Sequence, residues 1–388
     1  MKHISQPQVS VSRKASERHR SGHPWIFKTD VTEFASAKPG DLVRVLDHQG
    51  RLLGQAHFSA TSQIALRMLT QWQAPIDLGE RIAAAQAYRK TIVKNTNAYR
   101  MVHAEADLLP ALVVDRYGDY ISIQTLNQGM DKATPVLVAA LEEQFAPKAI
   151  VARNDAAVRT LEELPRETKV LSGEIDGPVP VSMNGFQLEA DLMTGHKTGV
   201  FLDQRENYMA AARWAKGKAL DCFTATGGFA LHMARVCDSV EAADSSLPSL
   251  ETAERNANKN GLSNIEFVEA DVFELLSSYT SARKTFDTVV LDPPSFAKSK
   301  KQVDGAARGY KDINLRGLRL LESGGILVTC SCSHHMSEAA LIEIAAAAAA
   351  DAGRTVRVLE VRRQAQDHPV LLSVPETRYL KCLILQVV

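Results

Sequence analysis

The chain has 388 residues, of which 45% are hydrophobic and 23% charged, and its 45 basic and 45 acidic side chains give a formal net charge of zero. This length predicts two or three globular domains, and the neutral balance argues against bulk non-specific binding to nucleic acid. The sequence lacks a run of about 18 apolar residues, so we expect no membrane-spanning helix, and residues 1–12 lack the apolar core of a signal peptide. The five cysteines form no CxxC pair and show no metal-ligand spacing, which indicates a reducing cytoplasm and no metal site.

Residues 1–73 are expected to form a small β-rich module with a local basic charge. Ten Lys or Arg and five Asp or Glu give this segment a charge of +5, so the remainder of the chain carries −5. Such a basic footprint is typical of contact with a phosphate backbone, and the alternative is a solvated basic face. The expected strands, separated by turn signals, are Gln8–Val11, Leu42–Leu46, Leu52–Phe58 and Gln63–Leu69.

The basic string over residues 13–20 supplies candidate RNA contacts. Trp25 and Phe27 follow it and are candidates for stacking on bases, although packing in a core is the favoured interpretation of both rings. The segment resembles a PUA domain, a small RNA-binding barrel, on the motifs GHPWIF (22–27), PGDLVRVLD (39–47) and LGQAHFS (53–59). The candidate RNA-binding residues are Arg13, Lys14, Arg18 and Arg20.

Residues 74–190 follow a short linker and predict a central α+β domain that carries no cofactor motif. Glu105 and Asp107 are candidate catalytic carboxylates, but a capped or solvated turn is the favoured interpretation. The expected elements are a helix over Leu78–Val93, a hairpin of Leu112–Asp115 and Tyr120–Leu126, a helix over Asp131–Phe145, a strand over Lys148–Arg153 and a second hairpin over Val179–Leu188.

Residues 191–388 alternate strand-like and helix-like segments and end in two strands. This alternation predicts an α/β domain with a seven-stranded, Rossmann-like, mostly parallel sheet. The expected strands are residues 219–222, Val240–Asp244, Ile265–Glu269, Thr288–Leu291, Gly325–Cys332, Val356–Val361 and Tyr379–Gln386.

A glycine loop and three strand-end carboxylates form the expected ligand site of this domain. In DCFTATGGF (221–229) the glycines let the backbone approach a ligand, and the helix that follows offers free N–H groups. Asp244 lies 23 residues after Asp221, where nucleotide-binding domains hold the ribose hydroxyls, and Asp271 suits the exocyclic amine of a purine. Because G-x-G-x-x-G is absent, the pattern is that of class I S-adenosylmethionine methyltransferases and not of a dinucleotide site. The candidate cofactor residues are Gln204, Arg205, Phe223, Thr224, Gly227, Gly228, Asp244, Asp271 and Asp292.

Two stretches bear on the target chemistry, LDPPSF (291–296) and LVTCSCS (327–333). Methylation of an amino group uses an aromatic ring directly after Pro-Pro, but Ser295 stands in that place and Phe296 comes one residue late. Methylation of carbon 5 of a pyrimidine requires a thiolate that adds to carbon 6, and a cysteine at a strand end can supply it. Cys330 and Cys332 have the same parity and are expected to share a strand face. Cys332 is nearer the open end, Cys330 suits a buried core position, and the alternative is that both are structural.

The chain resembles the bacterial PUA-containing cytosine-C5 methyltransferases of large-subunit (23S) ribosomal RNA along nearly its whole length. The resemblance implies S-adenosylmethionine as donor, 5-methylcytidine in ribosomal RNA as product, a cytoplasmic protein and often a homodimer. It also implies a PUA domain (1–73), a central α+β domain (74–190) and a methyltransferase domain (191–388). Thr329-Cys330 departs from the family's usual Thr-Phe before Ser-Cys-Ser, and Ala225-Thr226 is a variant of the glycine loop. The motifs that carry the resemblance are RMVHAEADLLPALVVDRYGD (100–119), KTGVFLDQREN (197–207), DCFTATGGF, LDPPSFAKSK (291–300), SCS (331–333) and QAQDHPV (364–370).

The resemblance also assigns catalytic roles. RNA cytosine methyltransferases place the nucleophile eight residues after the first glycine of a Gly-Gly pair, and counting from Gly324 selects Cys332. Asp292 would hold the cytosine edge and assist its protonation, and the base would leave its stack first. Two alternatives stay open: N-methylation of an RNA purine through DPPSF, and a non-catalytic RNA-binding factor in ribosome assembly. Nucleoside analysis separates the two kinds of methylation, and a methyl-transfer assay identifies the third case.

Overall fold

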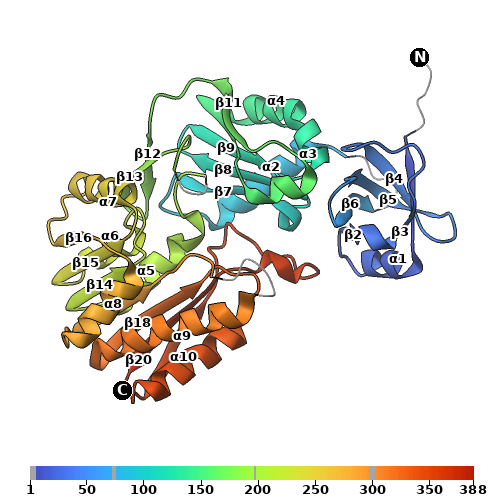
Figure 1. Ribbon diagram of the computed structural model, residues 1–388. Helices are drawn as coiled ribbons and strands as arrows, with labels where there is room; N and C mark the ends of the chain where they lie inside the picture. Colours follow the sequence, from blue (N-terminus) through green and yellow to red (C-terminus); the bar gives the residue numbers. More distant parts are fainter. Residues whose placement is uncertain (1–5, 72–75, 196–197, 297–301) are drawn as a thin grey trace. The chain divides into compact units, whose positions relative to one another are not determined.

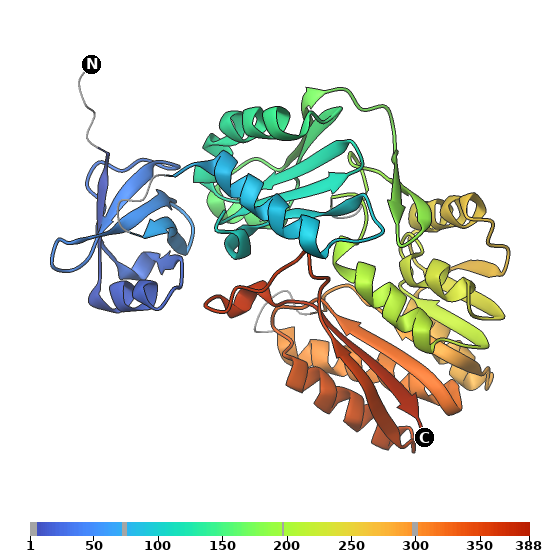
Figure 2. The ribbon, with the colours of Figure 1, turned by 180° about the vertical axis from the view of Figure 1, so that it is seen from behind.

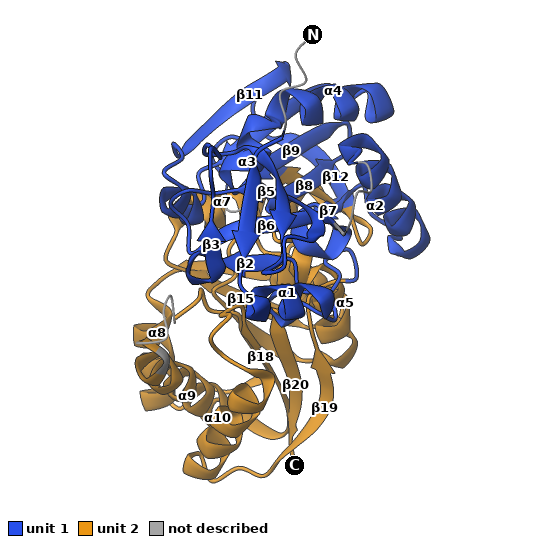
Figure 3. Cartoon of the chain, turned by 90° about the vertical axis from the view of Figure 1, so that its right-hand side faces the viewer, with its two compact units in different colours: residues 1–182, 190–200, 366–377 blue, residues 183–189, 201–365, 378–388 orange. Residues whose placement is uncertain are grey.

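The computed structural model of the chain describes residues 6–71, 76–195, 198–296 and 302–388. It divides into two compact units: unit 1 comprises residues 1–182, 190–200 and 366–377, and unit 2 comprises residues 183–189, 201–365 and 378–388 (Figure 3). The expected boundary at residue 73, Lys197 and residues 297–300 of the LDPPSFAKSK motif lie outside the described residues. The division into three domains at residues 73 and 190 stays a prediction.

The first sheet of unit 1 has six strands in the order β2-β6-β5-β4-β1-β3 (Figure 1). Its side chains alternate as in β4, where Val43 and Val45 are buried and their neighbours are not, because successive strand residues point to opposite faces. All four expected strands are present, but the basic string is a helix, α1, whose N–H of Ala15 is capped by the hydroxyl of Ser12. The elements are β1 (Gln8–Val11), α1 (Arg13–Arg20), β2 (Trp25–Phe27), β3 (Val31–Glu33), β4 (Leu42–Leu46), β5 (Leu52–Phe58) and β6 (Ile64–Gln71).

The second sheet of unit 1 has five strands in the order β11-β10-β9-β8-β7, and α2 and α4 share its core (Figure 2). In place of the single helix expected over Asp131–Phe145 there are two helices, because Pro135, in the first turn of α4, lacks the N–H that would continue α3. Strands β7 and β11 were not predicted. The elements are α2 (Leu78–Ile92), β7 (Ala98–His103), β8 (Leu112–Tyr117), β9 (Tyr120–Thr125), α3 (Gln128–Lys132), α4 (Thr134–Phe145), β10 (Ala149–Asn154) and β11 (Glu167–Gly173), followed by the hairpin β12 (Val179–Met183) and β13 (Phe186–Ala190).

Unit 2 is built on a seven-stranded sheet in the order β16-β15-β14-β17-β18-β20-β19, which confirms the expected fold class. The pairs from β16 through β18 are parallel, and β20 is antiparallel to both neighbours. Helices form two groups, α5 with α6 and α8 with α9 and α10, on the two faces of the sheet (Figure 1). The elements are α5 (Arg205–Trp214), β14 (Lys218–Cys222), α6 (Gly228–Ala234), β15 (Ser239–Asp244), α7 (Leu247–Lys259), β16 (Ile265–Glu269), α8 (Val272–Ser281), β17 (Phe286–Leu291), α9 (Val303–Arg319), β18 (Leu321–Ser331), α10 (Glu338–Asp351), β19 (Val356–Arg362) and β20 (Lys381–Val387).

The carboxyl ends of the parallel strands place the candidate residues at one edge of this sheet. Strand β14 pairs with β15 on one side and β17 on the other, so the order reverses at β14, where such sheets bind ligands. Strand β18 ends at Ser331, one residue earlier than expected. The alternation that was expected to place Cys330 and Cys332 on one face therefore does not extend to Cys332, which lies beyond the strand.

Candidate functional site

The loop between β14 and α6 has an unusual backbone that the sequence analysis did not predict in this detail. Phe223, Ala225 and Gly227 take positive φ angles of 63°, 49° and 89°. Gly228 starts α6, and a Cβ atom on it would lie 2.3 Å from Cζ of Tyr208, on α5. The structure gives this glycine a packing reason, because only a residue without a side chain lets α6 approach Tyr208. Its expected role in the approach to a ligand stays a prediction.

Asp221, at the penultimate position of β14, holds this loop from below. Its Oδ2 accepts hydrogen bonds from the hydroxyl of Thr224 (2.6 Å) and the N–H of Ala230 (2.9 Å). Its Oδ1 is buried and has no hydrogen-bond partner among the described residues. Burial raises the pKa of Asp221 to about 7, and the charges of Asp292 and Asp244 add to that rise. The structure therefore makes Thr224 part of the support of the loop, and it assigns Asp221 a role that the sequence analysis did not.

Asp244 and Asp271 follow neighbouring strands but differ in what they bind. Asp244, at the end of β15, accepts from the N–H of Ala225 in the glycine loop (2.9 Å) and from the N–H of Ser246 (2.9 Å). Asp271 is exposed and caps α8 by accepting from the N–H groups of its first turn. The structure thus joins Asp244 to the loop, whereas the protein contacts of Asp271 are those of a helix cap.

Two aromatic rings lie beside the loop. The half-buried ring of Phe223 packs edge-on against Phe273 of α8, with 6.5 Å between centroids. Phe273 in turn lies 5.7 Å from Phe296, which packs at 4.7 Å against Tyr310 of α9. Phe223 therefore lies at one end of a row of rings that borders the strand ends.

Gln204 connects the start of α5 to Asp292 beyond β17. The amide nitrogen of Gln204 donates to Oδ2 of Asp292 (3.0 Å), and its amide oxygen accepts from the side chain of Asn207 (2.6 Å). Gln204, directly before α5, and Asn207 of α5 are both buried, so Asp292 is held by one amide that a second amide positions. Arg205 is also buried and forms an ion pair with Glu206 (3.4 Å). Asn207 was missed by sequence reasoning, although its spacing of one helical turn from Gln204 was a usable signal.

The two candidate cysteines lie in different surroundings. Cys330 is fully buried, pairs with Cys382 of β20, and burial raises the pKa of its thiol well above the usual value. Cys332 is half-buried, whereas the other four cysteines of the chain, all within the described residues, are buried. The charge of a Cys332 thiolate acts on Tyr310 of α9 and on Lys381 of β20. The structure thus separates a core thiol from one at the edge of the sheet.

Lys381 is a further residue that sequence reasoning missed. It is 3% exposed, and its ammonium donates to the carbonyls of Ser333 (2.6 Å) and Tyr379 (2.7 Å). Burial lowers the pKa of Lys381 to about 8, while the neighbouring Cys332 opposes that fall. A lysine within the apolar strand KCLILQV was the available signal, because such a charge is rarely buried without a specific reason.

The candidate RNA-binding residues of unit 1 are largely engaged with acidic side chains. Arg13 pairs with Glu17 (2.8 Å), Arg18 with Asp30 (2.9 Å) and Arg20 with Asp47 (2.8 Å), and Lys14 is exposed. Of the stacking candidates, Phe27 lies under the guanidinium of Arg18 (4.7 Å), and the indole of Trp25 donates to Glu105 (2.8 Å). Asp107 accepts from the N–H of His103 (2.6 Å) and pairs with Arg89. The contacts of Glu105 and Asp107 support the structural interpretation, and the RNA contacts of α1 stay a prediction.

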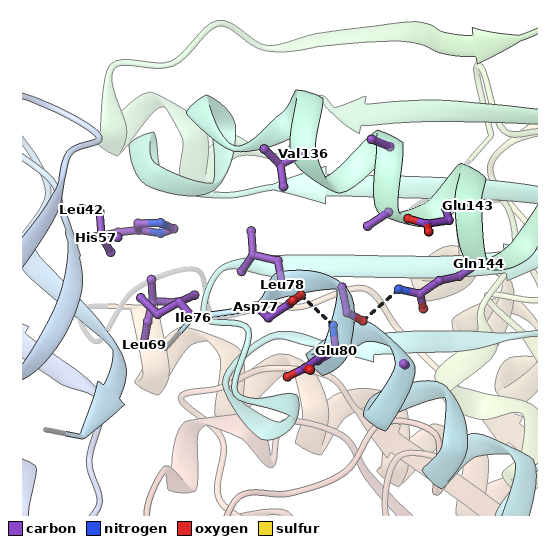
Figure 4. Close-up of a pocket in the computed structure, with 14 residues that line it drawn as sticks. Leu42, His57, Leu69, Ile76, Asp77, Leu78, Glu80, Val136, Glu143 and Gln144 are labelled. Atoms are coloured by element: carbon purple, nitrogen blue, oxygen red, sulfur yellow. Dashed lines mark hydrogen bonds between the residues drawn. The ribbon is translucent and has the colours of Figure 1, made fainter. Parts of the chain in front are cut away.

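A cavity of unit 1 is separate from these residues. It has a volume of about 910 Å³ and is lined by β4, β5, the end of β6, α2 and α4. Figure 4 shows Asp77, Glu80 and Glu143 around it, together with apolar side chains such as Val136. It contains no glycine loop and none of the candidate cofactor residues, so the candidate site is the strand edge of unit 2.

Comparisons with known proteins match a PUA-like domain in the N-terminal part of the chain and a methyltransferase domain in the C-terminal part. Residues 9–71 match the family model of a PUA-like domain, and residues 215–367 match that of a methyltransferase domain. Ribosomal RNA large subunit methyltransferase I of Shewanella denitrificans is 43% identical over 378 residues, which cover 94% of this chain and 95% of the relative.

Among solved structures, a candidate S-adenosylmethionine-dependent methyltransferase from Streptococcus mutans is 20% identical, with a TM-score of 0.83, and the match covers 98% of this chain and 100% of that chain. A methyltransferase in complex with S-adenosylhomocysteine is similar to the same degree, 20% identical with a TM-score of 0.83. The matches confirm the PUA-like domain, the methyltransferase domain and S-adenosylmethionine as cofactor. No helix of the described segments is both long and apolar enough to cross a membrane.

Proposed function

Because the chain belongs to the ribosomal RNA large subunit methyltransferase I family, we propose that it methylates carbon 5 of a cytosine in 23S ribosomal RNA through a covalent bond to Cys332. S-adenosylmethionine supplies the methyl group as an electrophilic carbon. Family membership supports the RNA substrate, and the resemblance supports a cytoplasmic homodimer. The observation that carries the chemistry is the position of Cys332, the one cysteine of five that is not buried, at the carboxyl edge of the sheet.

The neighbouring strand end brings a carboxylate to the same edge. Strands β17 and β18 are paired in parallel, with Leu291 opposite Thr329, so Asp292 and the segment that ends in Cys332 leave the sheet side by side. Asp292 is held there by Gln204. A thiol and a carboxylate at adjacent strand ends are the two groups that cytosine C5 chemistry requires, one to add to carbon 6 and one to bind the polar edge of the base.

The proposed reaction balances as follows. The thiolate of Cys332 bonds to carbon 6, and the electrons of the C5–C6 double bond move into the ring while Asp292 assists protonation at the N3–amine edge. Carbon 5, now nucleophilic, bonds to the methyl carbon while the bond from that carbon to the sulfonium sulfur breaks, so that S-adenosylhomocysteine leaves. A base then removes the proton from carbon 5, the C6–S bond breaks, the N3–amine edge gives back its proton, and the double bond and the free thiolate return.

The residues around the glycine loop fit the adenosine part of the cofactor. Asp244 reaches the loop through its bond to Ala225, and its half-buried carboxylate retains lone pairs that can accept from ribose hydroxyls. The unpartnered Oδ1 of Asp221 lies under the same loop. We expect Asp244→Ala to weaken S-adenosylhomocysteine binding in calorimetric titration about tenfold or more, because each lost bond to a buried polar group costs about 1–3 kcal/mol. Unchanged affinity would remove Asp244 from the cofactor site.

The covalent step is tested by substitution and trapping. Cys332→Ala should abolish methyl transfer and leave S-adenosylhomocysteine binding intact, whereas Cys330→Ala should lower stability and retain activity. RNA that carries 5-fluorocytosine should form a stable adduct with the wild type and with Cys330→Ala, but not with Cys332→Ala, because fluorine at carbon 5 cannot leave as a proton does. Trapping that depends on Cys330 would reverse the assignment. Full activity of the double variant would end the covalent mechanism.

N-methylation of a purine through DPPSF is the second candidate, and the packing of Phe296 disfavours it. Phe296 lies 4.7 Å from Tyr310, and a side chain on Gly309 would come within 3.3 Å of its ring, so α9 occupies the surface that a stacked base would need. Nucleoside analysis of RNA modified by the protein distinguishes 5-methylcytidine from N-methylated purines. Absence of any methyl transfer would favour a non-catalytic assembly factor.

A further inference from the structure

Lys381 of strand β20 contacts the residue before Cys332 and the residue after it. Lys381, the first residue of that strand, pairs with Ser331, the residue before Cys332. The ammonium of Lys381 donates to the carbonyl of Ser333, the residue after it, at 2.6 Å. The cysteine therefore lies between two attachment points of one lysine, and the segment that carries it is fixed although it lies outside the regular strand.

The charge on Lys381 lacks the compensation that buried lysines usually have. Lys381 is only 3% exposed, and it takes part in no ion pair among the described residues. An ammonium has three N–H donors, and the carbonyls of Ser333 and Tyr379 account for two. Burying such a charge costs several kcal/mol unless an anion or full hydrogen bonding offsets it. The arrangement leaves one N–H and one unneutralised charge beside Cys332.

We propose that Lys381 is a positioning residue that holds Cys332 as its thiolate. This inference rests on the proposed role of Cys332 as nucleophile. The thiol proton passes to the amine of Lys381, so a neutral pair becomes a thiolate and an ammonium, and the amine keeps its two bonds to the carbonyls in either state. When Cys332 leaves the methylated base, the ammonium again faces a thiolate, and no other proton donor is needed.

Several other charges act on the same segment. Tyr310 faces it from α9, and Asp292, beyond β17, opposes ionisation of the neighbouring thiol of Cys330. His334 and His335 follow Cys332 in the chain. Arg378 and Glu338 also act on Lys381, with opposite signs, and they form an ion pair with each other. Their opposite charges offset one another, so Lys381 is the buried cation whose charge interacts with Cys332.

The pairing is measured by the pH dependence of alkylation of Cys332 in the full-length protein. Iodoacetamide reacts with the thiolate, and peptide mass spectrometry assigns the reaction to Cys332. The wild-type rate should have its inflection at least one pH unit below the value of about 8.5 for an ordinary thiol. Lys381→Met should return the inflection to 8.5 or above and slow alkylation at pH 7 about tenfold or more. Lys381→Arg, which keeps the cation, should retain a lowered inflection.

Lys284→Met is the control, because Lys284 is an exposed lysine of unit 2 that is paired with Glu241. It should leave the inflection unchanged. In methyl transfer, the loss caused by Lys381→Met should shrink as pH rises from 7 to 9.5, since the thiolate then forms unaided, whereas a structural defect would be independent of pH.

A wild-type inflection at or above 8.5 overturns the proposal without any variant, and so does an unchanged inflection in Lys381→Met. If Lys381→Met does not fold, the wild type and Lys381→Arg decide. If either result is obtained and Cys332→Ala is inactive, the role of Lys381 is refuted but the covalent mechanism is not. An active Cys332→Ala refutes the mechanism, while alkylation still reports whether the pair exists.

Discussion

Replacing Asp221 with Asn should make the protein more stable relative to the wild type as pH rises. Burial raises the pKa of this carboxyl from 3.8 to about 7 in the folded protein. Between those values the folded state binds a proton that the unfolded state has released. The wild type therefore loses stability as pH rises from about 4 to about 7, since stability falls wherever the folded state binds more protons. Asn carries no such proton and should not show this loss.

The size of the effect follows from the shift. A rise of roughly three pKa units corresponds to about 4 kcal/mol over the full range, and about 2–3 kcal/mol of that falls between pH 5 and pH 8. Asn can still accept from Thr224 and Ala230 through its amide oxygen, and any fixed cost of the substitution cancels when the two pH values are compared.

Urea unfolding followed by circular dichroism at pH 5 and pH 8 measures the difference. The free energy of unfolding of Asp221→Asn minus that of the wild type should rise by about 2–3 kcal/mol between the two pH values. Asp238→Asn, at an exposed aspartate of the same unit, is the control and should show no such trend. A difference that stays constant with pH in Asp221→Asn would refute the reasoning, because it would mean that Asp221 is ionised in the folded protein at pH 5.

Two further substitutions test packing and RNA contact. Gly228→Ala should lower stability by about 1–3 kcal/mol and weaken S-adenosylhomocysteine binding, because its Cβ would lie 2.3 Å from Tyr208. The control is Gly305→Ala in α9, where the nearest atom to the new Cβ would be 3.8 Å away. This substitution should be neutral or stabilising by about 0.5–1 kcal/mol. Equal effects on the melting temperature would contradict the packing argument. Lys14→Ala should lower the slope of log affinity for RNA against log salt by about one, whereas Arg18→Ala, which breaks the pair with Asp30, should lower stability and leave the slope unchanged. A slope that Lys14→Ala does not alter would show that α1 does not meet phosphate.

Local sequence patterns were enough to predict the sheet of unit 2 and most of the residues at its edge. Buried parallel strands appear as short apolar runs between helical segments, so the ends of β15, β16 and β17 could be located, and with them Asp244, Asp271 and Asp292. The glycine-bearing loop before α6 could also be located, because glycine is typical of tight turns, but the positive φ angles of Phe223 and Ala225 could not be predicted. The two cysteines could be named as candidates from strand position alone.

Only the tertiary structure decided what each of these residues contacts. Gly228 lacks a side chain because the ring of Tyr208 on α5 packs against it. The hydrogen bonds of Asp221 to Thr224 and Ala230 could be identified only once the conformation of the loop was known. Lys381 lies beside Cys332 because β20 inserts between β18 and β19 in antiparallel register, across a sequence separation of 49 residues. The local sequence pattern predicts the alternation of side chains along a strand but not which strand will pair with it, because pairing depends on how whole faces of the sheet pack. For the same reason the sequence did not predict that β18 ends at Ser331. Because of this end, Cys330 lies in the strand and Cys332 lies beyond it, in different surroundings.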